Sequence, residues 1–175
     1  MMLVQVAWAV LGVVIVGGAL LARRSHTAYR AAIGALAVLY TAAGAAVHAW
    51  NLATDVSYSG FADWSWSSFV TDTWESLVVP HEWVFIGMLV AFEATVGVLV
   101  LIPGRPRRIG LTLILAFHVA LVSFGWVYLV WVVPMGFALV LLLRAERQEH
   151  RLDASGLVPT TARRQVGPDR RTEVM

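Results

Sequence analysis

One apolar stretch, from Trp83 to Ile102, constrains the fold of this chain more than any other feature of its sequence. A bilayer core about 30 Å thick is crossed by roughly 20 apolar residues in a helix, and this stretch is long enough for that. A single carboxylate, Glu93, lies near its centre, where a charged side chain costs at least about 2.5 kcal/mol unless it is paired, neutralised or hydrated. The stretch therefore predicts a membrane span that faces something other than lipid at Glu93.

The composition supports a membrane protein and excludes several other classes. Of the 175 residues, 59% are hydrophobic and 14% are charged, and a soluble core of this size does not need four separate apolar runs. No cysteine is present, which excludes disulfides and thiolate metal sites. All 13 basic residues are arginine. They form short clusters beside the apolar runs, where membrane orientation explains them, and nucleic-acid binding gains no support.

The first apolar run, Val4–Leu21, predicts an N-terminal span within residues 1–22. Its arginines follow the run, whereas a cleaved signal peptide carries its positive charges first, so we expect the span to be retained. A second run, 31–51, carries a stripe of mostly small residues at helical spacing, which favours close packing against another helix. The stripe consists of Gly34, Ala37, Thr41, Gly44, His48 and Asn51.

The last apolar run, 109–143, is too long for one ordinary span. A hairpin that turns near residues 123–126 divides it into two spans and places all the arginine clusters beside spans on one side of the membrane. We therefore predict an all-α transmembrane helical bundle of five spans in a bacterial plasma membrane, with the N-terminus outside and the C-terminus in the cytoplasm. Residues 146–175 are polar with mixed charges, which predicts a disordered cytoplasmic tail.

The segment 54–82 is acidic and aromatic and contains no arginine. Such a segment between two spans is typical of an extracytoplasmic loop whose indole rings lie at the depth of the lipid headgroups. Phe61, Trp64 and Phe69 roughly share a helical face, so we expect a short helix at the membrane surface here.

Glu93 and His118 are the sharpest candidates for a site within the membrane. They lie about a dozen residues on either side of the turn near Arg105, so an antiparallel hairpin rising about 1.5 Å per residue places them at similar depth. A Glu–His pair there could hold or pass a proton. The alternative is a His118 that binds backbone carbonyl groups beside a Glu93 that is simply protonated, and both interpretations stay open.

A second polar group is expected near the outer surface, where His48, Asn51, His81 and Glu82 approach the membrane boundary. Glu82 and Glu93 are close to three helical turns apart, so they share a face. Imidazoles and carboxylates can bind metal ions or haem iron, but no two histidines here are spaced as ligands on one helix. A polar lining of an outward-facing cavity is the favoured interpretation, and haem and metal are disfavoured.

From Arg30 onward the sequence resembles the DoxX-like family of small bacterial membrane proteins. The resemblance lies in the Arg30–Ala35 segment, the Gly44-Ala-Ala-Val-His48 step, the aromatic loop, and the Phe92-Glu93-Ala-Thr-Val-Gly97 helix, which is followed by a glycine and arginines. It covers about residues 29–145 and implies a core of four spans, to which the first span is an addition. His48 stands where many relatives have a lysine after the glycine, so a role that needs this lysine does not transfer.

The resemblance implies an accessory subunit of a membrane redox system linked to quinone, and a lipid-like or quinone ligand near Glu93 is the first functional hypothesis. One alternative is a proton-coupled transporter of small molecules that uses Glu93 as its titrating group. Another is a membrane enzyme that uses Glu93, His118 and His48 as acid–base groups on a lipid-like substrate. The expected partners are the lipid bilayer, an oxidoreductase and a second copy of the chain. Motifs for hydrolysis and phosphate binding are absent from the sequence, and whether the chain is an enzyme stays open.

Overall fold

The computed structural model describes residues 2–154, and it describes side chains for residues 4–148. Within that range every regular element is a helix, and five helical segments are apolar and long enough to cross a membrane. The chain is therefore a multi-pass membrane protein, and the predicted all-α bundle of five spans is confirmed. The spans are α1 (Met2–Leu21), α2 (His26–Val38) continued by the π-helix η1 (Leu39–Ala45) and α3 (Ala46–Ala53), α5 (Glu82–Leu99), α6 (Arg105–Leu121) and α7 (Trp126–Ala154).

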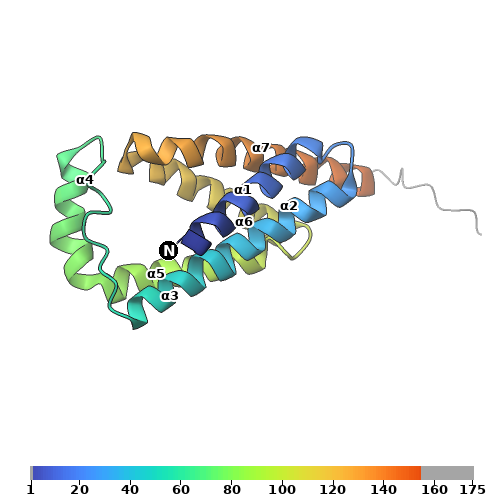
Figure 1. Ribbon diagram of the computed structural model, residues 1–175. Helices are drawn as coiled ribbons and strands as arrows, with labels where there is room; N and C mark the ends of the chain where they lie inside the picture. The colour runs from blue at the N-terminus through green and yellow to red at the C-terminus, as the bar shows by residue number, and fades with distance from the viewer. Residues whose placement is uncertain (1, 155–175) are drawn as a thin grey trace, which may run out of the picture.

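The spans form a ring of neighbours around the bundle axis (Figure 1). α1 packs against α2 and α7, α5 packs against η1, α3 and α6, and α6 packs against α7. Because consecutive spans run in opposite directions, the bundle has two distinct ends (Figure 1). The end that carries the loops at Arg23 and Arg105 is called the arginine end. The end at which α3 finishes and α5 and α7 begin is called the loop end.

The tightly packed core lies in the half of the bundle nearer the arginine end. Its fully buried side chains come from every span. They include Ile15, Leu36, Val96, Val100, Leu111, Ile114, Leu139 and Leu142. Large apolar side chains such as Val13 and Val133 are exposed on the outside of the bundle, which suits a surface covered by lipid.

The part of the small-residue stripe that contains Ala37, Thr41 and Gly44 packs against α5, as its composition predicts. A Cβ atom added to Gly97 of α5 would lie 2.5 Å from Thr41 Cγ2 and 3.3 Å from the carbonyl oxygen of Ala37. The two helices therefore approach each other more closely than a larger side chain at residue 97 would allow.

The turn between α6 and α7 confirms the hairpin predicted near residues 123–126. A short 3-10 helix, η4 (Val122–Phe124), is followed by Gly125, whose φ of +112° is one that side chains rarely adopt. A Cβ atom at Gly125 would also lie 1.6 Å from the carbonyl oxygen of Trp64. Only glycine fits between this turn and the loop that crosses it.

The segment between α3 and α5 lies across the loop end of the bundle (Figure 1). It contains α4 (Ser68–Thr73), the π-helix η2 (Trp74–Val78) and the 3-10 helix η3 (Val79–His81). Ser65 Oγ donates a hydrogen bond to the carbonyl oxygen of Ser123, and Trp66 Nε1 donates one to that of Val122, both at 2.8 Å. These bonds attach the segment to the α6–α7 hairpin.

The aromatic residues of this segment do not share one face, which differs from the expected surface helix. Phe61 and Trp64 lie in turns before α4 begins at Ser68, so helical periodicity does not relate them to Phe69. Phe61 stacks on Trp74 with ring centroids 4.9 Å apart, whereas Trp64 and Phe69 are exposed. The segment therefore has an inward aromatic group and an outward one.

The last helix extends beyond the boundary that the sequence suggested. α7 continues to Ala154, and Glu146, the first residue of the predicted tail, is buried. Its carboxylate accepts hydrogen bonds from Tyr29, Gly104 and Arg107, and these bonds stabilise the helix beyond residue 145. Residues 155–175, which make up the rest of the predicted tail, lie outside the described residues.

Candidate functional site

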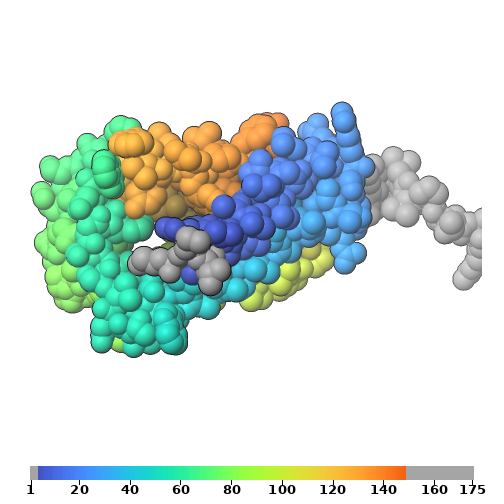
Figure 2. Space-filling view, in the orientation of Figure 1, coloured from blue at the N-terminus to red at the C-terminus, as the bar shows by residue number. Residues whose placement is uncertain are grey.

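A large cavity occupies the half of the bundle nearer the loop end. Its volume is about 930 Å³, which is near the upper end of the usual range for small-molecule sites. Figure 2 shows an opening bordered by α1, α7 and the loop segment. Most of the lining is aromatic or aliphatic, and the polar side chains in it are Gln5, Tyr40, His48, Tyr58, Glu93, His118 and Tyr128.

The π-helix η1 forms part of the cavity wall beside α5. Short π-helical segments often occur at functional sites, because the wider turn changes which side chains face a neighbour. Here Tyr40 lines the cavity, and Gly44 lies against Glu93. A Cβ atom at Gly44 would lie 2.8 Å from Glu93 Oε1 and 3.0 Å from Oε2. Glycine at this position therefore leaves room for the carboxyl group.

Glu93 is buried in the cavity wall, with only 4% of the residue exposed. Its Oε1 lies 3.9 Å from His48 Nε2, and its Oε2 has no hydrogen-bond partner. A buried acceptor or donor without a partner costs about 1–3 kcal/mol, and more when it is charged. The carboxyl group therefore lacks a hydrogen-bond partner at Oε2 among the described residues.

His118 is the second buried polar residue of the wall, with 2% exposed. Its Nδ1 donates to the carbonyl oxygen of Ile114 at 2.9 Å and lies 3.3 Å from the Tyr40 hydroxyl. Because Nδ1 carries the proton in that bond, Nε2 of the neutral ring is an acceptor. Nε2 is buried and has no partner. The ring thus presents an unused acceptor.

Glu93 and His118 line the same cavity. No hydrogen bond or ion pair joins their side chains among the described residues, and the ion-pair partner of Glu93 there is His48. The backbone contact expected in the alternative interpretation is present at His118. The two side chains therefore contribute separate polar groups to one site.

Three of the polar residues expected near the outer surface meet around Tyr58. The Tyr58 hydroxyl lies 2.7 Å from His48 Nδ1, and Asn51 Nδ2 donates to it at 3.5 Å. The Tyr58 backbone N–H donates to Glu82 Oε1 at 2.8 Å. Burial raises the pKa of the Tyr58 phenol, so the hydroxyl stays protonated. The fourth residue, His81, is exposed and does not join them; its Nδ1 lies 3.0 Å from the carbonyl oxygen of Leu77.

The sequence did not single out several aromatic residues of the cavity, among them Tyr40, Tyr58 and Trp131. Tyr58 is one of several aromatic residues in its loop, and only the fold separates it from the membrane anchors. Tyr40 directly precedes Thr41 of the small-residue stripe, so its hydroxyl within an apolar run was a usable signal. Trp131 gave none, because it lies in a uniformly apolar run. Among the described residues, no group of three or more His, Cys, Asp or Glu side chains is arranged to hold a metal ion.

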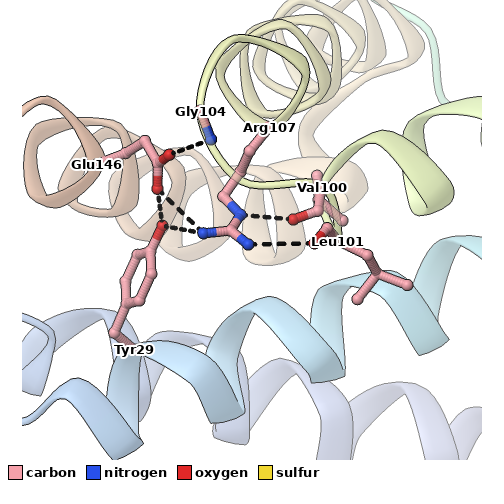
Figure 3. Close-up of polar contacts among 6 residues, drawn as sticks. All are labelled: Tyr29, Val100, Leu101, Gly104, Arg107 and Glu146. Carbon is pink, nitrogen blue, oxygen red and sulfur yellow. Dashed lines mark hydrogen bonds and ion pairs between the residues drawn. The ribbon is translucent and has the colours of Figure 1, made fainter. Parts of the chain in front are cut away.

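The arginine end of the bundle is closed by a polar network (Figure 3). Arg107 Nε donates to the carbonyl oxygen of Val100 at 2.7 Å, and Nη2 donates to that of Leu101 at 3.2 Å. Arg107 Nη1 lies 3.3 Å from Glu146 Oε2, which also accepts from the Tyr29 hydroxyl. This network joins α2, the end of α5, α6 and α7. Among the described residues, these contacts hold the four helical segments together at the end of the bundle away from the cavity.

The chain matches no model of a known protein family, no curated protein and no solved structure. What it does must be inferred from the cavity and its polar groups.

Proposed function

We propose that this small multi-pass membrane protein binds a lipid-like amphiphile, with a quinone as the leading candidate, in the cavity around Glu93. One observation carries the proposal. The wall of a mostly apolar cavity contains two buried polar atoms, Glu93 Oε2 and His118 Nε2, that have no hydrogen-bond partner among the described residues. A ligand with a polar group and a large apolar part would offer hydrogen-bond partners to these atoms and apolar contacts to the rest of the wall.

The chemistry of the two groups suits a ring that carries carbonyl or hydroxyl oxygens. A protonated Glu93 donates a hydrogen bond to a carbonyl oxygen, and His118 Nε2 accepts one from a hydroxyl group. The aromatic lining, including Phe117 and Phe124, offers ring faces and edges against which a planar ring can stack. The site would therefore hold both an oxidised quinone and its reduced form.

The resemblance to the DoxX-like family supports a more specific role. We infer that the protein is an accessory subunit of a membrane redox system in a bacterial plasma membrane, and that it presents the quinone to an oxidoreductase partner. The positive-inside rule supports an orientation with the arginine end in the cytoplasm, so the cavity would lie in the outer half of the membrane.

The transport alternative requires the arginine end of the bundle to open as well. A transporter must expose its site to each side in turn, and here the half nearer the arginine end is filled by fully buried side chains and sealed by the Arg107–Glu146 network. A binding site with access at one end of the bundle needs no such rearrangement.

The proposal is tested by purifying the protein in a mild detergent and identifying the bound small molecules by mass spectrometry. Leu121 lines the cavity, so Leu121→Trp should fill it and lower the amount of bound amphiphile by at least about tenfold, equivalent to ~1.4 kcal/mol. Val119 lies on the same helix but is 66% exposed and does not line the cavity, so Val119→Trp is the matched control.

Three results would overturn the binding function: no amphiphile in the wild-type preparation, equal retention by Leu121→Trp, or equal loss in the control. Partner chains in the same preparation test the accessory role separately. A co-purified oxidoreductase supports that role, and a preparation that keeps its ligand but contains no such partner contradicts it.

A further inference from the structure

The cavity reaches the side of the bundle between α1 and α7. Its lining includes Gln5 and Trp8 near the start of α1, and Val130 and Trp131 of α7. Val130 is 77% exposed, so this part of the wall is also part of the outer surface. Figure 1 shows that α1 begins short of the loop segment, and the opening in Figure 2 lies at that point. Access is therefore sideways, beside the start of α1.

A second hollow of about 430 Å³ follows the same two helices toward the arginine end. Its lining contains no polar side chain. It extends from Ala9 to Leu20 of α1, which is roughly 16 Å of helix at about 1.5 Å per residue. A Cβ atom added to Gly17 would meet no other atom within 4 Å, so the hollow has room for an apolar chain on the surface of α1.

Trp131 lies between the two spaces, because its side chain lines both the cavity and the hollow. A Cβ atom at Gly12 would lie 2.8 Å from the Trp131 ring, and the Trp8 ring lies 5.7 Å from it, centroid to centroid. The indole therefore stands between α1 and α7 at the point where a ligand would pass from the polar cavity to the apolar hollow.

We propose that the ligand enters sideways from the bilayer between α1 and α7 and that its apolar chain lies in the hollow along α1, past Trp131. This inference rests on the proposed binding function and names the class of ligand more closely: an amphiphile with a polar ring or headgroup and a long hydrocarbon chain. It also gives the additional first span a role, since α1 forms one wall of both the entrance and the chain site.

The test uses two probes with the same quinone ring, one with a methyl group and one with a long alkyl chain in its place. Their affinities are measured on the purified full-length protein in the same detergent. The long-chain probe should bind at least about tenfold more tightly to the wild type. Gly17→Leu should abolish that advantage and leave the short probe unchanged, because the leucine fills only the hollow.

Gly34→Leu is the matched control. Gly34 lies on α2, lines neither space, and also has no atom within 4 Å of an added Cβ, so it should keep the chain advantage. The entrance is tested by Val130→Trp, which should slow the binding of both probes several-fold. Val133 is also exposed on α7 but lines neither space, so Val133→Trp should not slow the binding.

The outcomes separate this inference from the proposed function. If both probes bind equally to the wild type, or if Gly17→Leu keeps the advantage of the long chain, the chain site is refuted while the cavity site stands. Unchanged binding rates in Val130→Trp would refute the sideways entrance. If neither probe binds and Leu121→Trp changes nothing, both the proposed function and this inference fail.

Discussion

Replacing Glu146 by leucine should destabilise the bundle, because the substitution leaves the partners of the carboxylate without an acceptor. Arg107 Nη1, the Tyr29 hydroxyl and the Gly104 backbone N–H all donate to Glu146. The Arg107 and Glu146 side chains are 12% and 5% exposed, so water replaces the lost partner only in part. Breaking a buried ion pair from one side typically costs 3–5 kcal/mol, and the partial exposure of Arg107 favours about 3 kcal/mol.

That cost corresponds to a drop of roughly 6–12 °C in the melting temperature, at about 2–4 °C per kcal/mol for a chain of this size. Thermal unfolding in detergent, followed by circular dichroism, measures it. Tyr29→Phe removes the hydrogen bond that the hydroxyl donates to Glu146 and the longer one, 3.4 Å, that it accepts from Arg107 Nη1, and should cost only about 1–2 kcal/mol. In the Arg107→Met/Glu146→Leu double variant no charge is left unpaired, so its melting temperature should lie closer to the wild type than that of Glu146→Leu.

An unchanged melting temperature in Glu146→Leu would contradict this prediction, since the network would then contribute nothing to stability. The same holds if the loss in melting temperature of the double variant equals the sum of the losses of Glu146→Leu and Arg107→Met measured separately. The two side chains would then act independently.

Gly125→Ala should destabilise the protein by at least about 1–3 kcal/mol, since it combines a strained φ with a collision against the Trp64 carbonyl oxygen; an unchanged melting temperature would show that the turn relaxes freely. Glu93→Gln should keep the fold but retain less amphiphile, and Glu93→Leu should retain still less; full retention by both would reduce Glu93 to a tolerated buried acid. Reporter fusions at Ser68 and Arg151 should lie on opposite sides of the membrane, because Arg151 follows the last apolar segment, Trp126–Gln148; fusions on the same side would contradict the odd number of spans between them.

The sequence by itself determined the number of spans and the place where the last apolar run turns. Apolar length, arginine placement and the excess length of residues 109–143 were sufficient to predict five spans and the hairpin that ends at Gly125. These features follow from the local sequence, because each span must satisfy its own backbone hydrogen bonds and match the bilayer thickness. The depth of a residue also follows, since it depends only on the rise per residue, and Glu93 and His118 do line one cavity.

Only the tertiary structure decided which side chains meet. The direction in which a side chain points depends on how helices cross and on the π-helix Leu39–Ala45, which interrupts regular helical periodicity. The structure therefore places His48 3.9 Å from Glu93, brings Tyr58 from the loop against His48, and leaves His81 outside. The cavity likewise arises from the packing of all five spans and the loop, and no single stretch of sequence encodes it.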